Sequence, residues 1–347
     1  MNRGVVYGLA SAVLFGMSTP LAKTLVGSVP PLMLAGLLYA GAGAGLLAVF
    51  ITQRLQSSRS ANLPPRRDLP WLAGAILLGG VLGPVALMHG LTTTPASSAS
   101  LLLNLEAVFT ALLAWFLFRE NFDRRIALGM LAIVLGGLTL AWSPLESGGT
   151  VIGPLLIAAA CVCWAVDNNL TRKVATSDAV FIAGLKGLVA GVVNIGLALV
   201  LGYPVPPLAI ASAAALVGFL GYGVSLVLFV LALRHLGTAR AGAYFSVAPF
   251  FGAALALLVQ GEAVTWQLAA AGALMATGVW LHLTEQHAHV HTHEVVEHTH
   301  MHSHDDHHRH DHEFGRDGGQ PHVHAHVHQP LLHSHPHYPD THHRHDH

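Results

Sequence analysis

The sequence predicts an all-α membrane protein with ten transmembrane helices, arranged as two inverted repeats of five helices and followed by a disordered histidine-rich tail. Three observations support this prediction: the composition, the spacing of apolar segments and an internal duplication. Of the 347 residues, 53% are hydrophobic and only 10% are charged, whereas roughly 25% of the residues in soluble domains are charged. The 36 glycines suit helices that pack closely within lipid.

A bilayer core of about 30 Å requires roughly 20 apolar residues per helix. Ten segments approach that length, and short connectors bearing proline, glycine or charge separate them. The first is too long for the apolar core of a signal peptide, so we expect it to be retained. In chain order the predicted spans are Gly4–Val26, Leu32–Thr52, Leu69–Gly90, Ala96–Phe118, Ile126–Trp142, Val151–Thr171, Ala179–Gly202, Ile210–Leu233, Ala239–Val259 and Val264–His282.

The duplication is visible in residues 95–120 and 237–262, which align without a gap. Both copies begin with small residues, continue as an apolar run and end on a glutamate. The identical positions are Ala99/Ala241, Phe109/Phe251, Ala111/Ala253, Leu113/Leu255, Ala114/Ala256 and Glu120/Glu262.

The duplication divides the chain into residues 1–142 as a first five-helix repeat, 143–285 as a second and 286–347 as the tail. The ends of the first and sixth spans, FGMSTPLAK and WAVDNNLTRK, place Lys23 opposite Arg172. Because five is an odd number, the second repeat enters the membrane from the opposite side. Inverted repeats are typical of transporters, with the substrate site between the repeats near the midplane. Duplication can also merely enlarge a helix bundle, and that alternative stays open here.

The cations predict the orientation. With both termini in the cytoplasm, twelve lysines and arginines flank the cytoplasmic ends of the spans and none lies in the loops of the other side. This asymmetry is a strong positive-inside signal, and we expect a multi-pass protein of the cell (inner) membrane. The twelve are Arg3, Arg54, Arg59, Arg66, Arg67, Arg119, Arg124, Arg125, Arg172, Lys173, Arg234 and Arg240.

The ten spans, the duplication, FGMSTPLAK and the segment NLEAVFTALLAWFLFRE resemble the drug/metabolite transporter superfamily, in particular its EamA-type transporters. The resemblance covers roughly residues 4–284. It implies a secondary carrier that moves a small metabolite, often outward and usually with a proton gradient. Members often have a proline after the glutamate of the fourth span. This chain has Ala107 there and keeps a proline only in the second copy, Pro249, which puts a kink of the first copy in doubt.

Five polar residues within the spans are candidates for the substrate and proton pathway: Glu106, Asp167, Lys186, Asn168 and Asn104. An ionisable side chain at the bilayer centre costs about 2.5–3.5 kcal/mol, so each needs a partner or a function. Asp167 and Lys186 lie at similar distances from the turn between two antiparallel spans, which would let them pair. Either Lys186 neutralises Asp167 or Glu106 as a buried structural pair, or a carboxylate, preferably Glu106, exchanges a proton while Lys186 or Asp167 contacts the substrate. Asn104 is expected to form hydrogen bonds across helices.

The tail contains 23 of the 26 histidines and a duplication of its own. Neutral imidazole is a good ligand for Zn, Ni, Co and Cu, and alternate residues of an extended segment share one face. We expect the tail to be disordered without metal and to bind divalent transition metals. The candidate ligands are His287, His289, His291, His293, His298, His300, His302, His322, His324, His326, His328, His333, His335 and His337.

Two transport hypotheses follow, together with a third from another class. The first is a proton-coupled exporter of a small metabolite whose tail buffers or senses metal. The second is a transition-metal exporter, and the third a membrane-anchored metal sensor or store. The first is favoured because the spans offer Glu106 and Asp167 but no midplane cluster of His, Cys and Asp ligands, which a metal path should show. We expect no enzymatic activity, because no pair of a nucleophile and a base stands out in the spans, and no cofactor is expected to be required. Nucleic-acid binding is not expected either, because the arginines are scattered along the membrane edges. A homodimer is possible.

Overall fold

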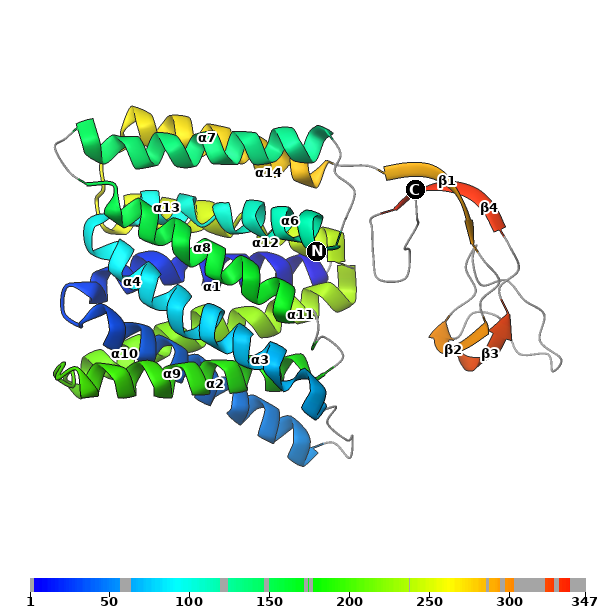
Figure 1. Ribbon diagram of the computed structural model, residues 1–347, viewed down its shortest axis with the longest axis horizontal. Helices are drawn as coiled ribbons and strands as arrows, with labels where there is room; N and C mark the ends of the chain where they lie inside the picture. Colours follow the sequence, from blue (N-terminus) through cyan, green and yellow to red (C-terminus); the bar gives the residue numbers. More distant parts are fainter. Residues whose placement is uncertain are drawn as a thin grey trace. The chain divides into compact units, whose positions relative to one another are not determined.

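The computed structural model places the apolar segments in one helical bundle (Figure 1). Two compact units are present, Met1–Thr284 and Glu285–His347. The structure describes residues 3–56, 64–118, 124–146, 150–171, 174, 177–236, 238–284, 287–293, 297–302, 322–327 and 331–337.

The first repeat is formed by α1 to α7, and its third and fourth spans are each built from several consecutive elements. Their bounds are α1 Arg3–Val26, α2 Pro31–Gln56, η1 Arg66–Asp68, α3 Leu69–Ala75, η2 Ile76–Leu82, α4 Gly83–Thr93, α5 Ala96–Leu102, α6 Leu105–Phe118 and α7 Arg124–Glu146. The second repeat follows the same order with α8 Ile152–Thr171, α9 Ala179–Val200, α10 Leu208–Gly218, η4 Phe219–Val224, α11 Ser225–Leu236, α12 Thr238–Phe245, α13 Ala248–Val259 and α14 Trp266–Leu283.

The ten predicted spans are confirmed as helical segments, with boundaries that differ by a few residues. Within the described ranges, eight are long and apolar enough to cross a membrane, and α13 is a shorter apolar helix. The broken pair α12–α13 is the ninth span and α14 the tenth. The chain is therefore a multi-pass membrane protein with five spans in each repeat.

The third span of each repeat contains a π-helical stretch at the same relative position. Ile76–Leu82 lies in the first repeat and Phe219–Val224 in the second, 142 or 143 residues later. π-Helical turns widen a helix locally and occur frequently at functional sites. The repeats thus share an irregular feature as well as a helix order.

The fourth span is also interrupted in both repeats, between α5 and α6 and between α12 and α13. Only the second break has the expected proline, Pro249, in the first turn that follows it. The doubt about a break in the first copy was therefore misplaced. There Asn104 interrupts the helix, because its Nδ2 donates to the Leu101 carbonyl at 2.9 Å and thus competes with the regular backbone pattern.

The two repeats meet most closely where α2 crosses α9. A Cβ at Gly43 would overlap the backbone of Leu188, and one at Gly187 would meet the backbone of Gly43. Helices in lipid associate through van der Waals packing, which small residues at the crossing strengthen. Glycine at these positions therefore allows the backbones of the two repeats to touch.

The tail unit contains four strands, β1 His287–His293, β2 Glu297–His302, β3 His322–Val327 and β4 Leu331–His337. They form two antiparallel pairs, β1 with β4 and β2 with β3. The sequence did not predict this pairing. The register sets six pairs of histidines directly opposite each other, namely His287/His337, His289/His335, His291/His333, His298/His326, His300/His324 and His302/His322.

We predict that Gly43→Ala lowers the stability of the purified protein in detergent by about 1–3 kcal/mol, the usual range for an overpacked interface. The matched control is Gly196→Ala on α9, where an added Cβ meets nothing within 4 Å. That change should leave the thermal unfolding temperature unchanged or raise it slightly, because alanine favours helix more than glycine. Equal melting temperatures for Gly43→Ala and the parent protein would contradict the close crossing.

Candidate functional site

A cavity of about 500 Å³ lies within the helical unit, between the two repeats. The first repeat contributes α1, α2, η2 and α6 to its lining, and the second contributes α8, α9, η4, α11 and α12. This volume falls within the range of roughly 300–1,000 Å³ typical of small-molecule sites. The position matches the repeat interface at which inverted-repeat transporters bind substrate.

The cavity extends toward one end of the bundle. Its lining includes Val174, Ser177 and Ala179, which belong to the connection between α8 and α9 and to the first turn of α9. Arg3 and Arg124 begin helices at this same end, so we name it the arginine-bearing end.

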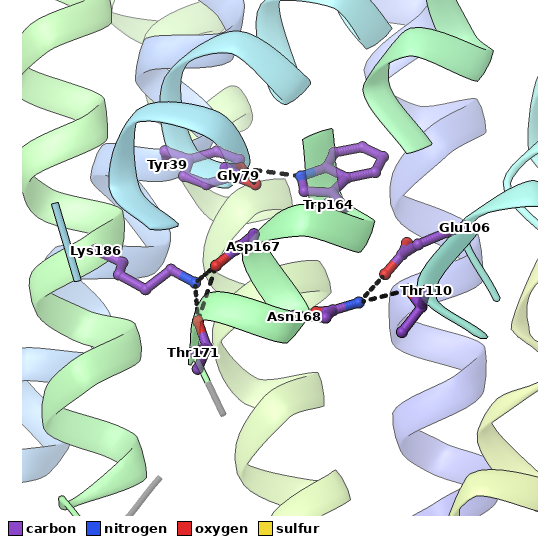
Figure 2. A network of polar contacts seen from close by, with 9 residues as sticks. All are labelled: Tyr39, Gly79, Glu106, Thr110, Trp164, Asp167, Asn168, Thr171 and Lys186. Atoms are coloured by element: carbon purple, nitrogen blue, oxygen red, sulfur yellow. Dashed lines mark hydrogen bonds and ion pairs between the residues drawn. The ribbon is translucent and has the colours of Figure 1, made fainter. Parts of the chain in front are cut away.

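Lys186 and Asp167 form an ion pair inside the cavity, as the sequence predicted (Figure 2). Lys186 Nζ lies 2.5 Å from Asp167 Oδ1 and donates to Thr171 Oγ1 at 3.2 Å. Thr171 Oγ1 in turn donates to Asp167 Oδ1 at 2.8 Å. Because Asp167 and Thr171 are four residues apart on α8, both face Lys186 of α9. The lysine and aspartate thus neutralise each other in a largely buried setting.

Glu106 lies in the same cavity, on the first turn of α6. Asn168 Nδ2 donates to Glu106 Oε1 at 2.9 Å and to Thr110 Oγ1 at 3.4 Å (Figure 2). Among the described residues, no cation pairs with this carboxylate. Three of the predicted pathway residues, Asp167, Asn168 and Lys186, are therefore brought together with Glu106 around one space.

Asn104 is placed elsewhere. Its buried side chain bonds to Leu101 of its own span and approaches Met275 Sδ of α14 at 3.8 Å. Asn104 is not among the described residues that line the cavity. Its observed roles are to break the fourth span and to contact another helix.

The π-helical stretch η2 contributes a carbonyl group to the cavity. Gly79 O accepts hydrogen bonds from Tyr39 OH at 3.0 Å and from Trp164 Nε1 at 2.9 Å (Figure 2). A Cβ at Gly79 would overlap the carboxylate of Asp167. The glycine therefore lets η2 of the first repeat lie directly against the charged residue of the second.

A continuous series of aromatic rings forms another part of the lining. Tyr39 contacts Tyr222, Tyr222 contacts Phe15, Phe15 contacts Phe245 and Phe245 contacts Phe229, with ring centroids 4.8–6.0 Å apart. The sequence did not single out these residues as a group, because they come from five separate elements. The cavity thus combines an aromatic surface with the polar groups of α6, α8 and α9.

Two inverted five-span repeats around a central cavity that contains an ion pair and a further carboxylate are the architecture of a secondary transporter. The chain belongs to the EamA-like transporter family, which matches it twice, at residues 2–142 and 151–284. This double match agrees with the duplication seen in the sequence and with the predicted resemblance.

Similar proteins point to the same class. A protein of Methanothermobacter thermautotrophicus named "Uncharacterized transporter" is 30% identical over 292 residues, covering 80% of this chain and 85% of that protein. The "Uncharacterized inner membrane transporter YedA" of Escherichia coli K12 is 24% identical over 73% of this chain and 81% of its own length. A solved structure titled "Crystal structure of protein" shares the fold, with a TM-score of 0.59 and 23% identity over 81% of this chain and 95% of that one. The names of the two relatives indicate a transporter.

We predict that Lys186→Met destabilises the protein by about 3–5 kcal/mol, because it leaves the Asp167 carboxylate buried without its cation. The double variant Asp167→Asn with Lys186→Met should recover much of this loss, since neither charge then remains. Unfolding in detergent followed by intrinsic fluorescence measures both changes. Additive losses in the double variant would contradict a coupled pair.

Proposed function

We propose that the protein is a proton-coupled secondary carrier that exports a small organic metabolite across the cell (inner) membrane by alternating access. The observation that supports this most is the cavity between the repeats, which contains a neutralised ion pair and a separate carboxylate, Glu106. Both termini are cytoplasmic in this proposal, in keeping with the distribution of arginines and lysines. The cavity then faces the cytoplasm, which is the loading side for an exporter.

Glu106 is the proposed proton carrier. Asp167 and Lys186 compensate each other, so the cavity has one uncompensated negative charge whenever Glu106 is ionised. Enclosing an unpaired charge in a low-dielectric space is unfavourable. Glu106 therefore takes up a proton, or meets a complementary group of the substrate, before the cavity closes. The amide of Asn168 donates a hydrogen bond to the carboxylate and holds it toward the cavity.

The lining also restricts the substrate. A molecule in this space can place an apolar part against the rings of Tyr39 and Tyr222 and a polar part near Glu106 and Asn168. A bare metal ion suits this lining poorly. Within the part of the bundle that the structure describes, no group of three or more His, Cys, Asp or Glu side chains could hold one. An organic metabolite is therefore favoured over transition-metal export through the same cavity.

The tail is proposed to bind divalent transition metals from the cytoplasm. Support comes from the density and alternate spacing of its histidines and from the register of β1 with β4 and of β2 with β3. Of the candidate ligands, His328 lies outside the described residues. Within these registers, three pairs of histidines are Cα partners in β1 and β4 and three in β2 and β3. A metal sensor or store remains the competing role of this segment.

We predict that Glu106→Gln abolishes proton-driven export but preserves exchange of labelled for unlabelled substrate, because the neutral amide fills the same space without binding a proton. A metabolite profile of cells with and without the protein first identifies the substrate. Transport is then measured in proteoliposomes with and without a pH gradient. The control is Glu106→Asp, which keeps an ionisable group and should retain partial coupling. Full proton-driven export by Glu106→Gln would refute the proposed role.

We predict that removal of residues 286–347 eliminates binding of Zn²⁺ or Ni²⁺ by the purified protein and leaves metabolite export unchanged. Binding by the full-length protein should weaken below about pH 6.5, because protonated imidazole cannot coordinate a metal. Isothermal titration at pH 5.5 and 7.5 measures this, with the truncated protein as the control. If cells that express the truncated protein no longer export metal, the result would favour the metal exporter instead.

A further inference from the structure

At the end of the bundle opposite the arginine-bearing end, charged side chains from both repeats form hydrogen bonds to one turn of the first repeat. The turn between α4 and α5 lies at this end, and Leu91, Thr94, Ala96 and Ser97 around it are at most 2% exposed. This turn joins the third and fourth spans of the first repeat. It therefore lies directly before the helix that leads to Glu106.

Lys23 forms hydrogen bonds to the residues on the N-terminal side of this turn. Its Nζ donates to the carbonyl of Leu91 and, at 3.0 Å, to that of Thr94. Leu91 lies in the last turn of α4, where a helix presents unsatisfied oxygens and a partial negative charge, and Thr94 is the residue that caps this end. The ammonium group is thus engaged by backbone carbonyls of the first repeat. It links the end of α1 to the end of α4.

Glu262 accepts hydrogen bonds from the residues on the C-terminal side of the same turn. Its Oε1 accepts from the Ala96 amide at 2.6 Å and its Oε2 accepts from the Ser97 amide at 2.9 Å. Glu262 belongs to the connection between α13 and α14, so this contact joins the second repeat to the first. Beside it, Gln260 Nε2 donates to Pro20 O at 2.7 Å and links the same connection to α1.

The charges of Lys23 and Glu262 have the signs that the two helix ends at this turn favour. A cation meets the carbonyl end of one helix and a carboxylate meets the amide end of the next, which is the favourable order for both helix dipoles. Hydrogen bonds to ionised groups are roughly twice as strong as neutral ones. The turn is therefore bonded to ionised side chains of both repeats.

We infer that Lys23 and Glu262 are gate residues that keep the cavity closed at this end and must release the α4–α5 turn when the carrier opens there. The inference rests on the proposed alternating access. It also explains the sequence, because Glu262 ends the second copy of the duplicated segment and Glu120 ends the first. Likewise, Lys23 is matched by Arg172 in the other repeat.

The test measures from which side of the membrane the cavity can be reached. The reporter is Ala183→Cys, on the α9 part of the lining, in a background with Cys161→Ala and Cys163→Ala. A membrane-impermeant maleimide is applied to right-side-out and to inside-out vesicles. With the gate intact, the reporter should react from the side of the arginine-bearing end and only slowly from the other.

Glu262→Gln and Lys23→Met should each raise labelling from the closed side by about tenfold, because each loses a hydrogen bond to a charged group. Glu262→Asp keeps the charge and should show an intermediate rate. Glu120→Gln removes the matching carboxylate of the first repeat and should not raise labelling from that side. Unchanged one-sided labelling in both Glu262→Gln and Lys23→Met would overturn the inference.

Retained labelling from the arginine-bearing side shows that a variant is folded. If Glu262→Gln does not reach the membrane, the double variant Lys23→Met with Gln260→Ala replaces it. Increased labelling of that variant from the closed side would support the inference, and unchanged labelling would overturn it. Labelling requires no transport, so the experiment tests the gate residues independently of the proposed export function. Altered sidedness without any metabolite export would support the gate and refute the proposed function.

Discussion

The cost of placing ionised side chains inside an apolar bundle constrains this structure more than any other factor. Lys186 and Asp167 satisfy that constraint by pairing, with Thr171 completing the hydrogen bonds. Glu106 does not have such a cation among the described residues and bonds to a neutral amide instead. A stable scaffold would not need this asymmetry, whereas a carrier that exchanges a proton or a substrate does. The chemistry of the site follows from one compensated and one uncompensated carboxylate.

The backbone around these groups is irregular in the same way in both repeats. Each third span contains a π-helical stretch and each fourth span is broken. Discontinuous helices in corresponding positions expose backbone groups where they border a cavity and not lipid. Gly79 shows the consequence, because its carbonyl accepts two side-chain bonds beside Asp167. The duplication therefore creates a site between the repeats with contributions from each.

Much of this arrangement could be read from the sequence. Hydrophobicity and length predicted the ten spans, and equal distances from a turn predicted the Asp167–Lys186 pair. Other features depend on contacts between distant segments. The Asn168–Glu106 bond joins residues 62 positions apart, and the aromatic rings come from five elements. The break at Asn104 needed no proline, since an amide side chain competes locally with the helix. Neither the π-helical stretches nor the register of the tail strands leaves a simple periodic signal.

The central claim is that the space between the repeats is the place where the transported molecule binds. The most direct measurement is an experimental structure of the protein in lipid nanodiscs, with the exported metabolite at saturating concentration. The account predicts that the metabolite lies between Glu106 and Asn168 on one side and the rings of Tyr39 and Tyr222 on the other. A metabolite bound outside this cavity, or a cavity that stays empty while transport proceeds, would contradict it.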